Sequence, residues 1–441
     1  MKRSITILFL LLLSVISVVG GQVQEEKIFT LQESVQIALK QNLDIKGSEQ
    51  KVIQKQWEGE ESKTDFFPQI TGSFSYARLD KVPSISVPIP GFPMKIEMSK
   101  KDVYNAQLQL TQPIFTGGAL SSRYRMKTEE LNIAGGEKKI IQQNVIFQVI
   151  QAYFSILKAA NFYQAAETLV NQRQTHLSNV KKLFEAGLAT KADILKTEVA
   201  LADAKQKLVE TENMMNLAKE NLKTILNLPP KQKVNCQDTL TQIQEEEKLD
   251  KWKAIAIEKR EELKQIERTR ATVELAKKIV MSDYYPNIAF VLSLQGEKGS
   301  STGLHSWYQN ISGALVMNID IWNWHRTRKK VNAIDAQISQ IETQKQKIIN
   351  LISLEITSAY LNLESAREKI RVMEKAVEDA QENVRVTDLL KKEGLATTTD
   401  VIDAQTYLFQ SKAVYYQALY DYQIAHYQLL KASGTLLDGF L

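Results

Sequence analysis

The sequence predicts a mixed α and β membrane protein made of two structural repeats, each a long helical hairpin plus a transmembrane β-hairpin. Three observations in the 441 residues lead to this fold class. Short motifs occur twice in the same order, two long blocks lack proline, and four stretches alternate between apolar and polar residues. The alternating stretches predict four strands per chain.

The doubled motifs define the two repeats. Three segments recur, 65–70 as 283–288, 152–157 as 359–364, and 185–190 as 392–397. The first pair is separated by 218 residues and the other two by 207, so the first copy carries about eleven extra residues. We expect a first repeat over 22–228, a linker over 229–250 and a second repeat over 251–441.

The N-terminus has the features of an export signal. Met1-Lys2-Arg3 precedes an apolar run over 5–19 and then Gly20-Gly21, which predicts a signal peptide over 1–21. The run is short for a bilayer span, and no other apolar run approaches 18 residues, so we expect no transmembrane helix. The single cysteine, Cys236, excludes an intrachain disulfide, and a net charge of +5 without a dense basic run argues against nucleic acid.

Proline is absent from 114–228 and from 287–441, so long helices are expected in these blocks. Apolar residues recur there at 4-3-4 spacing, as Val145, Val149, Ala152, Ile156 and as Ile352, Ile356, Ala359, Leu363. We expect a helix from about 121 to 185, with a kink or a change of packing at Gly135-Gly136. Gly187 and Gly394 predict left-handed helix ends, and the Thr and Asp residues after them predict caps for shorter helices ending near 226 and 430.

Four stretches alternate with period two, namely 70–77, 104–111, 288–295 and 311–320. This pattern is typical of transmembrane strands with an apolar face toward lipid and a polar face toward a lumen, although a soluble sheet with one wet face also alternates. Aromatic residues at the strand ends predict contacts with the membrane interface: Phe66, Phe67, Tyr284, Tyr285, Trp307, Trp322 and Trp324. The connections 80–102 and 296–306 are expected to be loops, the first an external insertion.

The number of strands has a consequence for assembly. Four strands cannot close around a lumen, and an open sheet edge is not tolerated in lipid. Several chains must therefore share one barrel, although the strand count does not give their number.

The duplicated order of helix, β-hairpin, very long helix, Gly-Leu turn and helix resembles the TolC-type outer membrane efflux proteins, or outer membrane factors. The motifs that carry the resemblance are 186–193, 393–401, 31–39 with 42–45, and 226–229. It covers essentially the whole mature chain. It implies a homotrimer with a shared 12-stranded barrel in the bacterial outer membrane and a 12-helix periplasmic tunnel. Such a trimer is the exit channel of a tripartite efflux or type I secretion system, fed by an inner-membrane pump or ABC exporter through a periplasmic adaptor.

The resemblance also implies a gate. Asp400 and Asp403 match aspartates that ring the periplasmic entrance of such channels, and Asp193 matches an acidic partner in the first copy. The family's arginine and tyrosine partners fall on Ala396 and Lys391 here, so the latch must differ, with Lys391 or Lys392 as a substitute partner. The alternative for Asp400 is an ordinary first-turn aspartate stabilised by the helix dipole.

Two four-residue tips are the expected adaptor contacts: Gly187, Leu188, Ala189, Thr190, and Gly394, Leu395, Ala396, Thr397. These residues are also good turn formers, which alone would account for them. His176, His305, His325 and His426 are scattered without metal-ligand spacing, and no catalytic motif is present, so we expect neither an enzyme nor a cofactor. The competing hypothesis is a periplasmic coiled-coil adaptor or structural protein without a pore, which needs no lipid-facing strands.

Overall fold

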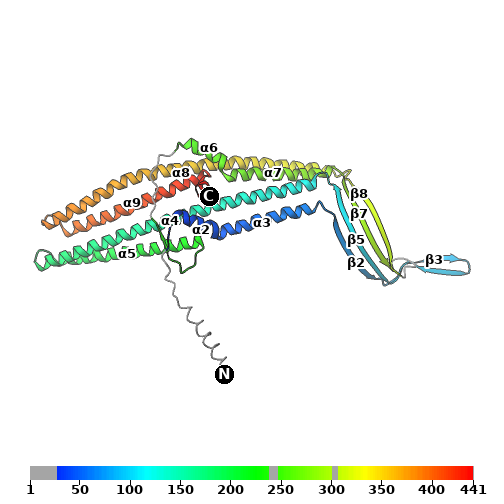
Figure 1. The fold of residues 1–441 in the computed structure, drawn as a ribbon, viewed down its shortest axis with the longest axis horizontal. Coiled ribbons are helices and arrows are strands. Elements are labelled where there is room, and N and C mark those ends of the chain that lie inside the picture. The colour runs from blue at the N-terminus through cyan, green and yellow to red at the C-terminus, as the bar shows by residue number, and fades with distance from the viewer. Residues whose placement is uncertain (1–26, 238–246, 300–305, 441) are drawn as a thin grey trace, which may run out of the picture. The chain divides into compact units, whose positions relative to one another are not determined.

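The computed structural model describes residues 27–237, 247–299 and 306–440 (Figure 1). The predicted signal peptide and much of the predicted linker lie outside these residues. The chain divides into two compact units: unit 1 is formed by 1–46, 142–256 and 354–441, and unit 2 by 47–141 and 257–353. Helices α4 (Ala119–Glu185) and α8 (Arg326–Lys392) contribute residues to both units.

Unit 2 contains a four-stranded antiparallel sheet in which each predicted alternating stretch forms a strand. Its members are β2 (Gln69–Arg78), β5 (Asp102–Phe115), β7 (Asn287–Lys298) and β8 (Tyr308–Asn318), in the order β2-β5-β7-β8. Every residue of β2 and of β8 is exposed, whereas most residues of the two central strands are half-buried. The described sheet therefore ends in two edge strands without a neighbour.

The register separates two faces of the sheet. One row across the strands is Ser73, Gln107, Gln295 and Asn310, and the next is Gly72, Leu108, Leu294 and Ile311. On the polar face the Gln107 amide donates to Gln109 at 3.1 Å, and Gln109 donates to Thr111 at 3.2 Å. One polar and one apolar face is the arrangement that the alternation predicts.

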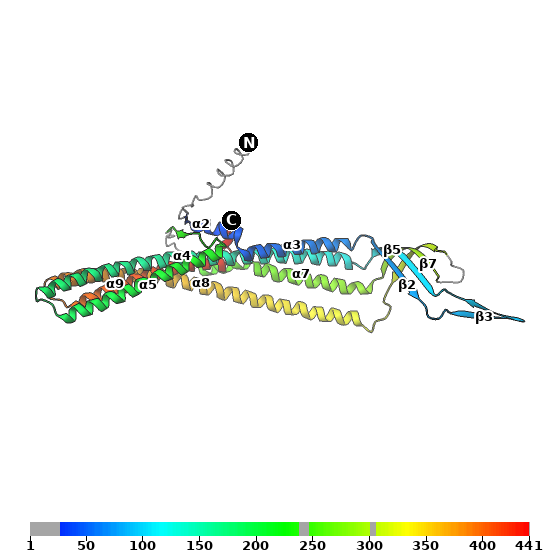
Figure 2. The same cartoon turned by 90° about the horizontal axis from the view of Figure 1, so that it is seen from below.

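The expected loop over 80–102 contains a second hairpin instead. Strands β3 (Ser84–Ile89) and β4 (Phe92–Glu97) pair antiparallel beyond the end of β2 and β5 (Figures 1 and 2). The prolines in this segment led to the prediction of a loop, but Pro88 lies opposite Pro93, and an isolated two-stranded hairpin tolerates proline because its outer edges carry no ladder. One face of this hairpin is apolar and exposed, including Ile85, Met94 and Phe92.

The helical part of unit 2 holds two antiparallel helix pairs. Helix α3 (Leu43–Thr64) lies along the first part of α4, and α7 (Glu261–Met281), followed by a short 3₁₀ turn, lies along the first part of α8. Ion pairs between α7 and α8 are Lys277–Asp335, Arg270–Glu342, Lys345–Glu267 and, from the 3₁₀ turn, Lys330–Asp283. Pairs such as Lys55–Glu130 at 3.2 Å join α3 to α4 in the same way.

Unit 1 holds the two helical hairpins and the core between them. The first hairpin pairs α4 with α5 (Lys191–Leu226) and the second pairs α8 with α9 (Thr398–Ala432), with their turns at the same end of the unit (Figures 1 and 2). All eight residues of the predicted 4-3-4 seams are buried, seven of them in unit 1 and Ile352 in unit 2. Smaller elements complete the unit: α2 (Leu31–Gln41), α6 (Leu249–Lys259), a 3₁₀ turn at Leu436–Gly439, and a parallel strand pair, β1 (Lys27–Phe29) with β6 (Val234–Cys236).

Helix α4 passes two sequence landmarks without a break. Gly135 and Gly136 lie inside it, and a Cβ on Gly136 would meet the Gln265 side chain at 3.3 Å, so this glycine permits close packing of α7 on α4. α4 also contains a stretch long and apolar enough to cross a membrane, although no other apolar run of that length was expected. That stretch is 61% buried inside the protein, as in the core helix of a soluble domain.

Candidate functional site

The two hairpin tips have the same backbone. Gly187 has φ of 75° and Gly394 has φ of 77°, a left-handed conformation that glycine adopts without strain. The next amide reaches back to the last helical turn, from Leu188 to the carbonyl of Leu183 and from Leu395 to that of Leu390, both at 2.8 Å. This is the Schellman ending that the Gly-Leu sequence predicts.

A reciprocal cap starts the helix after each tip. The Thr190 hydroxyl accepts from the Asp193 amide at 3.2 Å, while the Asp193 carboxylate accepts from the Thr190 amide at 3.0 Å. Thr397 and Asp400 make the same pair of bonds at 3.1 and 2.7 Å. Hydrogen bonds from Thr190 and from Thr397 lower the pKa of Asp193 and of Asp400 respectively. The predicted threonine caps are therefore present.

The predicted gate residues separate into two groups. The Lys391 ammonium donates to the Thr398 hydroxyl at 3.3 Å. A hydrogen bond from Thr398 and the charge of Lys391 also lower the pKa of Asp193. Asp193 of the first tip therefore lies close to these two residues of the second tip. The Asp400 carboxylate already accepts hydrogen bonds in the cap of α9, which fits the alternative of a first-turn aspartate. Asp403 lies one turn along the exposed side of α9, on the same face as Asp400.

The predicted adaptor-contacting tips are open to solvent. Leu188 is 76% exposed and Leu395 is 75% exposed, although both are large apolar side chains. The other tip residues are exposed or half-buried. Each tip therefore presents one large apolar side chain to solvent.

Sequence reasoning missed a buried arginine close to the tips. Arg173 of α4 is 3% exposed, and its Nη2 donates to the Ile402 carbonyl and to the Thr406 hydroxyl of α9, both at 2.7 Å. Nε and Nη1 of Arg173 have no acceptor among the described residues, and burial lowers the pKa of this guanidinium despite the nearby charge of Asp403. Arg173 therefore joins the two helical hairpins through α4 and α9.

His176 follows one turn later and is also buried. Burial, together with the charges of Arg173 and Lys391, lowers its pKa to about 4. A signal for both residues was present in the sequence, because the buried seam of α4 continues as Ala166, Leu169, Arg173, His176 and Val180. Two polar residues at core positions of this seam indicate an interaction between helices.

The predicted interface aromatics lie at the two ends of the strands. Phe66 and Phe67 precede β2, Tyr284 and Tyr285 precede β7, and Trp322 and Trp324 follow β8, so these six share one end. Trp307 precedes β8 at the opposite end, where its ring lies 6.4 Å from that of Tyr104, which lies 5.0 Å from that of Tyr76. All seven predicted aromatics are exposed. The alternation contained Tyr76 and Tyr104, but only the register brings them to the row of Trp307.

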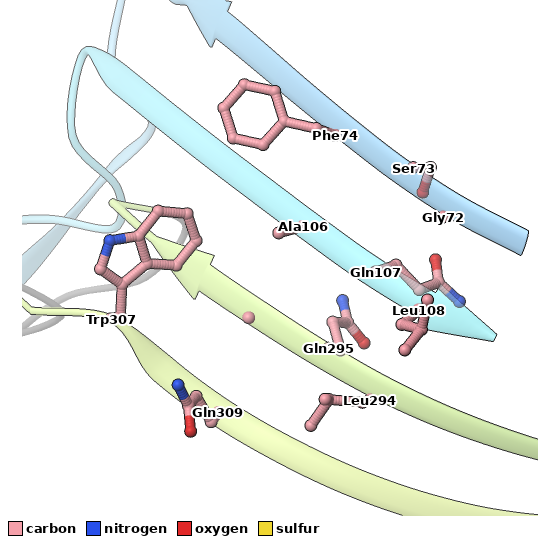
Figure 3. Close-up of a pocket in the computed structure, with 11 residues that line it drawn as sticks. Gly72, Ser73, Phe74, Ala106, Gln107, Leu108, Leu294, Gln295, Trp307 and Gln309 are labelled. Carbon is pink, nitrogen blue, oxygen red and sulfur yellow. The ribbon is translucent and has the colours of Figure 1, made fainter.

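Small residues open a groove in the sheet near the row of Tyr76, Tyr104 and Trp307. The groove has a volume of about 720 Å³, and its apolar lining is formed by Phe74, Leu108, Leu294 and Trp307 around Gly72, Ala106 and Gly296 (Figure 3). The polar residues Ser73, Gln107, Gln295 and Gln309 also line it. A Cβ on Gly296 would meet the Trp307 ring at 3.4 Å. An exposed apolar surface of this kind suits acyl chains better than water.

The chain matches the family model described as outer membrane efflux protein over residues 34–228 and 255–435. It belongs to the outer membrane efflux protein family. Alkaline protease secretion protein AprF of Pseudomonas aeruginosa is 21% identical over 356 residues, which are 77% of this chain and 71% of AprF. Outer membrane protein TolC of Escherichia coli is 22% identical over 352 residues, which are 75% of this chain and 69% of TolC.

Solved structures agree on the fold. The CmeC outer membrane channel of Campylobacter jejuni superposes with a TM-score of 0.76 at 16% identity, covering 92% of this chain and 86% of CmeC. The MtrE outer membrane channel of Neisseria gonorrhoeae gives a TM-score of 0.71 at 14% identity, covering 92% and 89%. The resemblance stated from the sequence is thus confirmed. The efflux protein is an outer-membrane exit channel of the kind that serves tripartite export systems, and the relatives are channels rather than enzymes.

Proposed function

We propose that three copies of this chain share a 12-stranded barrel in the outer membrane and a 12-helix tunnel in the periplasm. The observation that carries the proposal is the four-stranded sheet with two unpaired edge strands, β2 and β8. Such edges are costly in lipid unless another copy covers them. Export substrates then pass through the lumen lined by the polar face of the sheet, without covalent chemistry or a cofactor.

The hairpin tips form the periplasmic entrance in this proposal. Asp400 and Asp403, repeated three times around the axis, concentrate negative charge there and favour cations. Asp193 and Lys391 hold the two tips of one protomer together in place of the family's arginine and tyrosine. The exposed residues of 187–190 and 394–397 contact the helical hairpins of a periplasmic adaptor, which couples the channel to an inner-membrane pump or ABC exporter.

The proposed channel also has a definite organisation along the chain, with an export signal followed by two repeats. We infer a cleaved signal over 1–21, repeats over 22–228 and 251–441, and a linker over 229–250. The family match in two segments, 34–228 and 255–435, leaves a gap over 229–254 that includes the whole inferred linker.

Purified protein in a planar bilayer tests the assembly. The proposal expects a mass of three chains in detergent, recovery in the outer-membrane fraction, and stepwise conductance. A water-soluble protein that forms no conducting steps would overturn it and favour the adaptor hypothesis. Co-purification from membranes identifies the pump and the adaptor.

Block by a trivalent cation tests the gate. Asp403→Asn should weaken block from the periplasmic side at least several-fold, and Asp400→Asn should weaken it while also loosening the start of α9. Asp421→Asn is the matched control, because Asp421 is exposed on the same helix several turns away. Unchanged block in Asp403→Asn would show that this carboxylate does not line the entrance.

A further inference from the structure

The internal repeat contains the register of a contact that one chain alone cannot make. Residues of β2 and β7 correspond at an offset of 218, as Asp65 does to Asp283, and residues of β5 and β8 correspond at an offset of 207, as Ile114 does to Ile321. These offsets can be checked within the chain. Phe74 pairs with Ala106, and adding 218 and 207 gives Leu292 and Gly313, which do pair.

The pair β5–β7 is the joint between the first and the second hairpin of one chain. In a closed ring the same joint recurs between the second hairpin of one copy and the first hairpin of the next, that is, between β8 and β2. Leu108 pairs with Leu294 and Gln107 with Gln295 in β5–β7. Adding 207 to the first member and subtracting 218 from the second turns these pairs into Leu315 with Tyr76 and Ala314 with Ala77.

We infer that β8 pairs antiparallel with β2 of the partner subunit in this register, with Leu315 opposite Tyr76 of the partner subunit and Ala314 opposite Ala77 of the partner subunit. The inference rests on the proposed shared barrel and specifies the strand pairing between two copies, which is called the seam of the barrel below. Parity supports the register, since Leu315 and Tyr76 belong to the apolar face and Ala314 and Ala77 to the polar face of their own sheets. A shift by one residue would put apolar side chains in the lumen.

The turn after β8 gives independent support. The turn after β5 has Gly117 and Gly118 at φ of 59° and 84°, and the corresponding Trp324 and His325 have φ of 53° and 60°. Ala119 and Arg326 also donate to Thr116 and Asn323 in the same way, each at 3.0 Å. The two turns thus share one backbone conformation, although the second carries side chains that such a conformation disfavours.

The neighbours of Gly117 indicate what Trp324 contacts. A Cβ on Gly117 would meet the segment that precedes β7. It would lie 2.9 Å from the Ser282 carbonyl oxygen and 2.9 Å from the Tyr285 Cβ. At the seam the corresponding residues are Thr64 of the partner subunit and Phe67 of the partner subunit. The seam must be wider at this point, and the indole of Trp324 fills it against Phe67 of the partner subunit. Within one chain the Trp324 ring lies 5.7 Å from that of Trp322 and is still 78% exposed, and Phe67 is 63% exposed. Both side chains therefore have free surface for a contact between copies.

Cysteine cross-linking of the assembled channel tests the register. In a Cys236→Ser background, the in-register pairs are Ala77→Cys with Ala314→Cys and Ser75→Cys with Val316→Cys. The swapped pairs Ser75→Cys with Ala314→Cys and Ala77→Cys with Val316→Cys use the same four cysteines but are shifted by two residues. Opposite residues have Cβ atoms about 5 Å apart and shifted ones about 7–8 Å. Residues of β2 and β8 in one chain are about 14 Å apart, so any disulfide joins two copies.

The expected result is covalent dimers and trimers for both in-register pairs on oxidation, with at least a several-fold lower yield for both swapped pairs. A trimeric, conducting channel that cross-links equally in all four pairs, only in the swapped pairs, or in none overturns the register and leaves the proposed function standing. A protein that is monomeric and does not conduct overturns the proposed function itself.

A double-mutant cycle tests the aromatic contact. Phe67→Ala and Trp324→Ala should each lower the temperature at which the trimer dissociates, and the double variant should lower it by less than the two shifts together. Phe66→Ala is the control for Phe67, because it removes a neighbouring ring that already packs on Tyr124 of its own chain, with centroids 6.5 Å apart. Fully additive shifts for Phe67→Ala and Trp324→Ala would remove Trp324 from the seam.

Discussion

Glycine at the hairpin tips and glycine in the middle of α4 have opposite roles. Gly394 has φ of 77° with nothing within 4 Å of an added Cβ, so any cost of a side chain there arises from the backbone alone. Gly135 also has free space around an added Cβ, but it lies inside a helix, where glycine is the unfavourable residue. The same substitution therefore has opposite signs at the two positions.

Gly394→Ala should lower the opening free energy of the α8–α9 tip by about 1 kcal/mol, because alanine is strained at positive φ. Gly135→Ala should instead stabilise α4 by up to about 1 kcal/mol. Hydrogen exchange of amides around each site measures both changes. Equal signs at the two sites would contradict this explanation.

Acid should weaken the contact between the hairpins through His176. Its pKa in the folded chain is about 4, below the ordinary 6.5, because burial and then the charges of Arg173 and Lys391 disfavour the imidazolium. The unfolded chain takes up this proton near pH 6.5 and the folded chain only near pH 4. Stability is therefore full above pH 6.5 and falls progressively between pH 6.5 and pH 4, on the order of 3 kcal/mol in all. Exchange of α4 amides near His176 between pH 7 and pH 4 measures the loss, and His176→Gln should flatten the dependence.

At the scale of elements, α4 and α9 are held together by a side chain that is expensive to bury. Two hydrogen bonds from Arg173 to α9 favour the closed contact, whereas the desolvated guanidinium opposes it. The net contribution of Arg173 to this contact is therefore smaller than that of its two hydrogen bonds alone.

Arg173→Met should favour separation of α4 from α9 by about 2 kcal/mol, because both charge-assisted hydrogen bonds to α9 disappear. The expected readout is a higher single-channel conductance or a larger open fraction. Arg371→Met is the matched control, since Arg371 is exposed on α8. Conductance at or below that of the unmodified channel would mean that the buried charge, not its hydrogen bonds, dominates at Arg173.

At the scale of the whole molecule, the sequence predicted what depends on periodicity and left out what depends on pairing. The long helices, the buried seams from Val145 to Leu363, the four strands and the caps at Thr190 and Thr397 all follow from local chemistry. The pairing of β3 with β4 was missed because four prolines outweighed a short alternation around Ile85. Arg173 was missed because its partners on α9 lie more than 200 residues away in the sequence. The roles of the gate and tip residues remain predictions.

The β3–β4 hairpin should be dispensable for assembly, because the second repeat joins β7 to β8 through only the nine residues 299–307 and the four-stranded sheet does not use the hairpin. The Leu79 amide donates to the Lys101 carbonyl at 2.7 Å, so replacing 80–100 with Asn-Gly closes β2 onto β5 with a two-residue turn. We expect unchanged trimer yield and conducting channels in planar bilayers. Loss of the trimer would mean that the hairpin's exposed apolar face serves in assembly.

The ion pairs between α7 and α8 resist sliding. Asp335, Glu342 and Lys345 follow one another along α8, and their partners Lys277, Arg270 and Glu267 follow in the reverse direction along α7 with the same spacing. A displacement of one helix along the other by a single turn would therefore break all three pairs at once, although each exposed pair adds little to stability. The three ion pairs together therefore oppose shear, the sliding of α7 along α8, more than they oppose bending or gradual separation of the two helices.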